Sequence, residues 1–265
     1  MTRLGRATMT VLVGFAVGIA GGLIGLGGAE LRLPYLVGVL GLTAHVAVPV
    51  NLAVSLATIL AAIPARLMAL QGVALLPFIA ETCAIAVGAV AAAWIGAGWL
   101  KRLSGPALNR LIFVLLLSLG AALLIEAWLA EESAGLLPAA AVVRILAGVA
   151  FGLLIGAISS LLGVAGGEVI IPTLIFGYGV PVHAAGSLSM LISLPTVVAG
   201  IVRHARFGAY SDAALMSGVI VPMAAGSIAG AVCGGLLAAY VSAPLIKVAL
   251  GILLIWSAWK VFAKH

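Results

Sequence analysis

The sequence predicts an all-α polytopic membrane protein built from two inverted structural repeats, whose Gly-broken or re-entrant helices meet at the membrane midplane. Three observations support this fold class. The chain is too apolar for a soluble protein, because 65% of its 265 residues are hydrophobic, only 8% are charged, and the mean hydropathy is +1.35. A glycine-rich segment at residues 25–34 interrupts one apolar run. A similar segment recurs 138 positions later, at 163–172.

The two glycine-rich segments read Gly-Leu-Gly-Gly-Ala-Glu-Leu-Arg-Leu-Pro and Gly-Val-Ala-Gly-Gly-Glu-Val-Ile-Ile-Pro. A glycine weakens a helix by about 1 kcal/mol relative to alanine, whereas a glutamate suits the first turn of a new helix. Each segment is therefore predicted to end one helix and begin another. Irregular backbone at membrane depth persists only where protein or a water-filled cavity satisfies its polar groups. Paired broken helices of this kind are typical of transporter binding sites.

The apolar runs predict the order of the helices. A helix needs about 20 residues to span a bilayer, so the runs of about eleven that follow each glycine-rich segment are predicted to be half-helices or re-entrant arms. The first run follows Arg3 and Arg6 as in a signal peptide, but we expect a true helix because Gly14 matches Gly152 of the second repeat. The predicted units are repeat 1 (1–130), a linker (131–140) and repeat 2 (141–265), with apolar runs at 7–27, 30–40, 45–63, 73–99, 107–129, 141–164, 168–178, 184–203, 212–238 and 244–263.

The two repeats align without a gap when the numbering is shifted by 138. The matches include glycine, glutamate, proline and histidine: Gly25 with Gly163, Glu30 with Glu168, Pro34 with Pro172, and His45 with His183. A ridge of small residues also repeats, and its helical spacing predicts close packing of two helices in lipid. The ridge consists of Gly88, Ala92 and Gly96 in the first repeat and Gly226, Gly230 and Gly234 in the second.

The direction of the repeats depends on whether each half crosses the membrane four or five times. With five passages and a cytoplasmic N-terminus, nine Lys and Arg residues lie inside and three outside, whereas four passages give eight against four. The positive-inside rule therefore favours five passages and inverted repeats. It predicts a multi-pass protein of the cell inner membrane with residues 101–110 in the cytoplasm and 131–138 outside.

Each repeat carries one polar stripe, on the helix that follows its short apolar run. Spacings of four and three residues put the three members of a stripe on one helix face. Hydroxyls and amides gain nothing from lipid, so these faces are predicted to look into the bundle or a cavity, where they either bond neighbouring backbone or bind substrate. The stripes align position by position and consist of Asn51, Ser55 and Thr58, and of Ser189, Ser193 and Thr196.

The starts of the short helices are the candidate substrate site. Helix N-termini expose unpaired N–H groups and partial positive charge, which suits an oxyanion. Glu30 and Glu168 have two alternative roles. Each is either a cap of its own helix, or a neutral carboxyl group that binds the substrate or carries a proton. The backbone expected to cradle the anion comprises Gly27, Gly28, Ala29, Gly166 and Gly167.

Arg32 has no basic counterpart, because Ile170 occupies its position in the second repeat. It cannot face Glu30, which is two residues away on the same helix. An arginine at membrane depth needs a partner, so Arg32 is either a countercharge for the substrate or a member of a structural ion pair.

The remaining candidate groups are two histidines and two cysteines. His45 and His183 open the stripe-bearing helices and are either hydrogen-bonded structural residues or proton-coupling groups. Cys83 and Cys233 lie in apolar runs and are predicted to be packed thiols. No metal, cofactor or enzymatic activity is predicted, because the sequence has no cluster at ligand spacing, no catalytic triad and no Walker loop.

These motifs resemble the sulfite exporter TauE/SafE family of bacterial permeases for sulfur-containing anions. The resemblance covers nearly the whole chain and rests on segment 25–34, on Ala-Gly-Gly-Glu-Val-Ile-Ile-Pro-Thr at 165–173, and on Ala-Gly-Ser-Leu-Ser-Met-Leu-Ile-Ser-Leu-Pro-Thr at 185–196. It implies an ion-driven or potential-driven carrier without an ATPase domain. Many members have an apolar residue where this chain has Glu30, which indicates a subgroup.

The sequence thus predicts a secondary transporter that exports sulfite or an organosulfonate by alternating access. The alternatives are a proton-coupled importer of another small anion and a membrane assembly partner that transports nothing. The predicted partners are the small anion and the lipid bilayer, without nucleic acid, and a homodimer is one option for the assembly.

Overall fold

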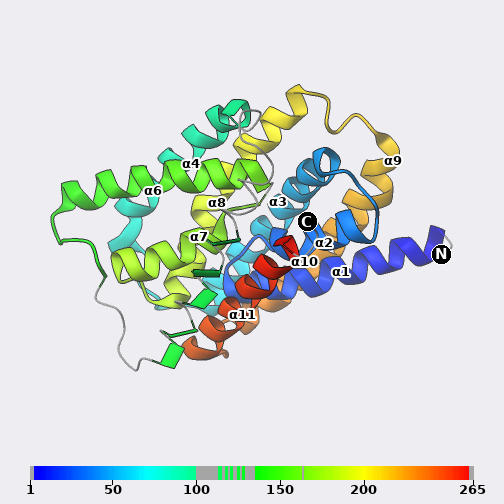
Figure 1. Ribbon diagram of the computed structural model, residues 1–265. Coiled ribbons are helices and arrows are strands. Elements are labelled where there is room, and N and C mark those ends of the chain that lie inside the picture. The colour runs from blue at the N-terminus through cyan, green and yellow to red at the C-terminus, as the bar shows by residue number, and fades with distance from the viewer. Residues whose placement is uncertain are drawn as a thin grey trace.

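The computed structural model describes residues 3–99, 135–162 and 164–262, together with five short pieces between 113 and 128. Every regular element in this part of the chain is helical (Figure 1), which confirms the predicted all-α class. Residues 101–110 and 131–134, used above for the topology and the linker, lie outside the described residues. Six described helices are long and apolar enough to cross a membrane: Ala7–Ile24, His45–Ala69, Leu76–Trp94, Ala141–Ser159, Val182–Arg206 and Ala213–Leu237.

The order of the elements repeats from one half to the other. The first half contains α1 (Arg3–Ile24), α2 (Ala29–Gly38), α3 (Ala44–Ala69), η1 (Leu76–Phe78) and α4 (Ile79–Trp99). The second half contains α6 (Ala141–Leu162), α7 (Gly167–Pro172), η3 (Thr173–Gly177), α8 (Val182–Arg206), α9 (Ala213–Leu215), η4 (Met216–Ile220), α10 (Val221–Leu237) and α11 (Ala243–Phe262).

Both glycine-rich segments break the helix as predicted, and the chain then folds back. Gly28 and Gly166 precede the short helices with φ angles of 70° and 80°, a left-handed conformation that glycine adopts without steric cost. The hydroxyls of Thr10 in α1 and Tyr35 in α2 lie 3.0 Å apart. A Cβ on Gly28 would lie 2.7 Å from Val17. The contact with Val17 is near the break and the contact between Thr10 and Tyr35 is farther from it along both segments, so α2 runs antiparallel to α1.

The small-residue ridges join helices from different halves. In α1 and α10, Gly14 packs on the backbone of Met223 and Gly22 on that of Ala231, so these two helices run parallel. In α4 and α6, Gly152 packs on the backbone of Ile85. Gly152 aligns with Gly14 and Ile85 aligns with Met223, so this is the Gly14–Met223 contact with the two repeats exchanged. The exchange agrees with a pseudo-two-fold relation between the repeats. Their orientation across the membrane stays a prediction, because the fifth run of the first repeat falls largely outside the described residues.

The buried core lies between the halves, whereas much of the outer helix surface is apolar and exposed. The main cluster includes Leu26 of the first break and Ile170 of α7, both nearly inaccessible. Cys83 and Cys233 are exposed on α4 and α10, so the prediction that they are packed thiols was wrong. An apolar helix in a membrane protein can turn a cysteine toward lipid as readily as toward its neighbours, because both environments are apolar.

Candidate functional site

The two helix breaks meet in the buried core. A Cβ on Gly27 would lie 2.7 Å from the Cβ of Ala165, and a Cβ on Gly167 would lie 2.7 Å from the side chain of Leu26. The starts of α2 and α7 are therefore adjacent, although they belong to different halves of the chain. The first N–H groups of each short helix have no carbonyl one turn earlier in that helix to accept from them. The structure thus brings the two predicted backbone cradles together.

Arg32 is fully buried and holds the first break against α3. Its guanidinium uses all five N–H groups in hydrogen bonds to protein oxygens. Asn51 also donates through Nδ2 to the carbonyl of Ala29, at 3.0 Å. The acceptors of Arg32 are Asn51 Oδ1 (3.1 Å), Ser55 Oγ (2.6 Å), Thr58 Oγ1 (3.0 Å), Ser227 Oγ (3.4 Å) and the Gly27 carbonyl.

This geometry changes the interpretation of the first stripe. Its three members accept hydrogen bonds from Arg32, which takes up part of the polar capacity that the stripe could offer to a substrate. All donors of Arg32 are used within the protein, and no carboxylate of the described part lies within 4.0 Å of it, so it makes no salt bridge there. Arg32 is instead a hydrogen-bonded strut between the break and α3.

The second stripe keeps the same positions but has no arginine to bind. Ser189 Oγ lies 3.2 Å from where a Cβ on Gly167 would be, so it faces the start of α7 as Asn51 faces the start of α2. Ser189 Oγ is buried and has no hydrogen-bond partner among the described residues. Ser193 is 1% exposed, and Thr196 donates to the Ile192 carbonyl at 2.9 Å. The second stripe thus retains unused hydrogen-bonding capacity at Ser189.

Glu30 and Glu168 are both buried next to the breaks. Both carboxyl oxygens of Glu30 and Oε1 of Glu168 have no hydrogen-bond partner in the described part of the chain. The two roles predicted for these carboxylates, helix capping and proton binding, both stay predictions. Buried polar groups without partners are uncommon, because each costs about 1–3 kcal/mol, and they indicate a role outside packing.

The two predicted histidines differ in their surroundings. His45 opens α3, six residues or about 9 Å along the helix from Asn51, so it lies away from the break. His183 lies at the start of α8, and its Nδ1 is buried without a partner among the described residues. The described residues contain no group of three or more His, Cys, Asp or Glu side chains that could hold a metal ion.

Arg66 was not among the residues singled out from the sequence. It is 1% exposed and donates to the carbonyls of Gly22 (2.8 Å) and Leu23 (2.6 Å) at the end of α1, to the His183 carbonyl (3.0 Å) and to Ser187 Oγ (3.2 Å). The signal was present in the sequence, because Arg66 lies on the same helical face as the first stripe. Arg66 therefore ties α1 and α3 of the first half to α8 of the second.

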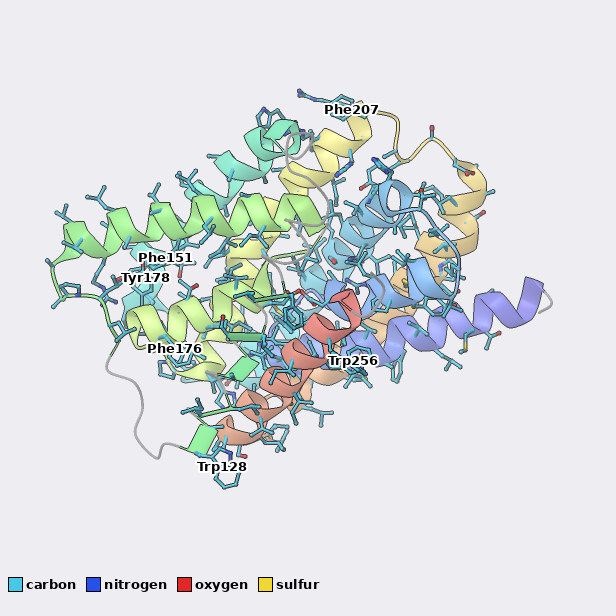
Figure 2. The ribbon with its side chains drawn as sticks, in the orientation of Figure 1. Trp128, Phe151, Phe176, Tyr178, Phe207 and Trp256 are labelled. Atoms are coloured by element: carbon cyan, nitrogen blue, oxygen red, sulfur yellow. The ribbon has the colours of Figure 1, made fainter. Side chains whose placement is uncertain are left out.

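An ion pair in the described part lies away from the breaks. Arg144 of α6 bonds Glu81 of α4 at 2.8 Å and lies 5.1 Å from the centre of the Tyr178 ring. Figure 2 shows Tyr178 near Phe151, with which it shares the main apolar cluster. Burial, and secondarily the Glu81 carboxylate, raise the pKa of Tyr178 to about 12, so its hydroxyl remains a donor to the Arg144 carbonyl.

Comparison with known families extends these observations to nearly the whole chain. Residues 9–261 match the family model described as sulfite exporter TauE/SafE. No curated protein and no solved structure matches the chain. The match and the six membrane-length helices together identify a multi-pass membrane protein of a transporter family for sulfur-containing anions. The chain therefore belongs to the sulfite exporter TauE/SafE family.

Proposed function

We propose that this protein is a secondary transporter that exports sulfite or an organosulfonate across the inner membrane by alternating access. Membership of the TauE/SafE family supports a sulfur-containing anion as the substrate. The observation that carries the proposal is the meeting of two helix starts in the core, beside a buried arginine that has no carboxylate of the described part within 4.0 Å.

The charge of Arg32 favours an anion even though its N–H groups are occupied. Its five acceptors are neutral oxygens, so the guanidinium keeps its full positive charge in the protein interior. A buried charge that makes no salt bridge is costly, and an anion nearby reduces that cost. Arg32 would thus attract the substrate through its field, while direct hydrogen bonds come from other groups.

Those direct hydrogen bonds would come mostly from the second half. The hydroxyl of Ser189 is available there and Ser193 follows it one turn along α8, whereas the equivalent groups of the first stripe are bound to Arg32. Thr196 borders the same stripe. The backbone N–H groups at both breaks complete the proposed site, which comprises Gly27, Gly28, Ala29, Gly166, Gly167, Ser189, Ser193 and Thr196, with Asn51, Ser55 and Thr58 in support of Arg32.

Glu30 and Glu168 are the proposed carriers of a coupling proton. Their unpartnered oxygens lie beside the breaks, where proton binding would remove the repulsion between a carboxylate and the substrate. His183 is a further candidate for this relay, because its Nδ1 is also buried without a described partner.

The test is flux of radiolabelled sulfite and of a labelled organosulfonate in proteoliposomes, with the gradient imposed in either direction. Ser189→Ala should weaken substrate binding about 10- to 100-fold, the value of one hydrogen bond to a charged group. The control is Ser217→Ala, which removes an exposed hydroxyl bonded to its own helix at 2.8 Å and should leave flux unchanged. Flux no greater than in empty liposomes would reject transport of these anions, and equal behaviour of the two variants would reject the site.

A further inference from the structure

The ends of α4 and α8 bring a tryptophan and two arginines together at one edge of the molecule (Figure 1). The guanidinium of Arg206 in α8 lies 5.0 Å from the centre of the Trp94 ring in α4. Arg203, one turn earlier, donates to the carbonyls of Ala93 (3.4 Å) and Trp94 in the last two turns of α4. Phe207, the residue after α8, marks this edge in Figure 2. Trp94 and Arg206 are exposed, and with Arg203 they form what we call the basic edge.

The positive charges of the basic edge make no salt bridge within the described part of the chain. Neither Arg203 nor Arg206 has a carboxylate of that part within 4.0 Å. The acceptors of Arg203 are neutral backbone carbonyls, and Arg206 contacts the face of an uncharged ring. A tryptophan face attracts a guanidinium without cancelling its charge. Two positive charges are therefore available to an anionic group outside the chain.

An exposed apolar stripe leads to the basic edge on each of the two helices. On α8, Val198 and Val202 precede Arg206 at spacings of four residues, so the three side chains share one helix face. On α4, Val87 lies seven residues, or about two turns, before Trp94. All three valines are exposed, and α4 packs against α8. The two stripes thus converge on the contact between Arg206 and Trp94, with apolar surface along the helices and positive charge at their ends.

Helix α8 is long enough to carry the basic edge out of the hydrocarbon layer. Its 25 residues extend about 37 Å, whereas the hydrocarbon core of a bilayer is about 30 Å thick. Arginine and tryptophan side chains are favoured at headgroup level, because each combines an apolar part with a polar group. The positive-inside rule predicts the cytoplasmic leaflet for this edge, and that leaflet carries anionic phospholipids.

We propose that the basic edge binds the headgroup of an anionic phospholipid, whose acyl chains lie along the exposed stripes of α4 and α8. The two guanidinium groups supply the charge that recognises the phosphate, and the valines supply the apolar surface for the chains. The inference is independent of the proposed transport, because it concerns the outer surface of the helices and not the breaks.

The pseudo-symmetric edge, where α3 and α10 end, has the apolar surface without the charges. A shift of 138 in the numbering gives the residues that occupy its equivalent positions: Ala65 for Arg203, Met68 for Arg206 and Val232 for Trp94. Met68 is exposed, as Arg206 is. Selective binding of an anionic lipid is therefore expected at one edge only.

Native mass spectrometry of the purified full-length protein in a neutral detergent tests the charge selectivity. It measures the affinity for phosphatidylglycerol and for phosphatidylcholine with the same acyl chains. Two arginines at about 1 kcal/mol each predict that phosphatidylglycerol binds about 25-fold more tightly. Arg206→Gln should reduce this ratio to about fivefold. Equal affinities of the wild-type protein for the two lipids would overturn the proposal.

Met68→Arg, made in the Arg206→Gln background, is the matched control. It restores the net charge of the wild type at the pseudo-symmetric edge, where Ala65 and Val232 stand in place of the other members of the basic edge. The affinity ratio should stay near about fivefold, because one arginine there lacks its partners. A return to about 25-fold would show that net charge alone governs the binding, and the proposal would fail.

Photocrosslinking locates the lipid without any substitution. Phosphatidylglycerol with a diazirine in one acyl chain is added to proteoliposomes of phosphatidylcholine that contain the wild-type protein, and the labelled residues are identified by peptide mass spectrometry. Crosslinks should concentrate at Val87, Val198 and Val202, and they should exceed those from a diazirine phosphatidylcholine at the same mole fraction. Crosslinks that cluster on other helices, or that are equal for the two lipids, would reject this surface as the site.

Discussion

Replacing Arg32 with methionine should destabilise the protein severely, because the guanidinium is the donor for five buried oxygens. Those oxygens would lose their donor, and each unsatisfied group costs about 1–3 kcal/mol. Removing a buried charge also removes its desolvation cost, so the net loss is smaller than that sum. The expected net cost is about 3–5 kcal/mol, below the roughly 5–15 kcal/mol that five unsatisfied groups would cost together. At roughly 2–4 °C per kcal/mol for a chain of this size, the apparent Tm should fall by roughly 6–20 °C.

The assay is thermal unfolding of purified protein in detergent at a fixed scan rate, because membrane proteins often unfold irreversibly. Arg206→Met is the matched control, since Arg206 is exposed on α8 and its contact with Trp94 is a cation–π interaction of about 0.5–1 kcal/mol. Arg32→Lys keeps the charge but has three donors in place of five, so it should recover only part of the lost stability.

A methionine variant as stable as the wild type would refute the structural role of Arg32. If such a variant also lost substrate binding, Arg32 would have to contact the substrate directly. The hydrogen bonds to Ser55 and Thr58 would then be a resting arrangement that the substrate displaces.

Three further predictions address packing, coupling and topology. Gly230→Ala should destabilise the protein by about 1–3 kcal/mol, because its Cβ would lie under 3.0 Å from the backbone of α1. In the control Gly218→Ala the Cβ meets no atom within 4 Å, so this variant should be neutral or stabilising by up to about 1 kcal/mol. Equal Tm shifts for the two variants would contradict this packing. If Glu30 and Glu168 carry the coupling proton, the double Glu→Gln variant should bind substrate but lose the pH dependence of flux in vesicles with a clamped proton gradient, and an unchanged profile would reject coupling. Reporters fused after residues 104 and 134 should lie on opposite sides of the membrane, and a shared side would exclude five passages.

The breaks could be predicted because they depend on local chemistry that repeats in the sequence. Glycines weaken the end of one helix, a glutamate suits the first turn of the next, and the gap-free alignment of the two halves showed that this pattern is duplicated. A short helix after the first break was expected from the length of its apolar run, which is too short for a span. These features need no knowledge of tertiary contacts.

The partners of Arg32 could not be predicted, because they lie on another helix. The sequence excluded Glu30 by spacing alone, but the turn at Gly28 decides which face of α3 the guanidinium meets. The sequence pattern of the first stripe fits equally well with substrate donors or with acceptors for an arginine. Only the fold distinguishes these two roles, and it assigns the acceptor role to Asn51 and Thr58.

The two halves share their main backbone contacts, so a difference in their function must come from the positions where their side chains differ. Arg32 faces Ile170 in the alignment, and Arg66 faces His204. Both arginines are buried and hydrogen-bonded, and both fix helices of the first half. The second half has neither strut, and the buried Ser189 hydroxyl there has no partner among the described residues. Movement during transport should therefore be larger around the second break, where fewer buried hydrogen bonds must be broken for the backbone to shift.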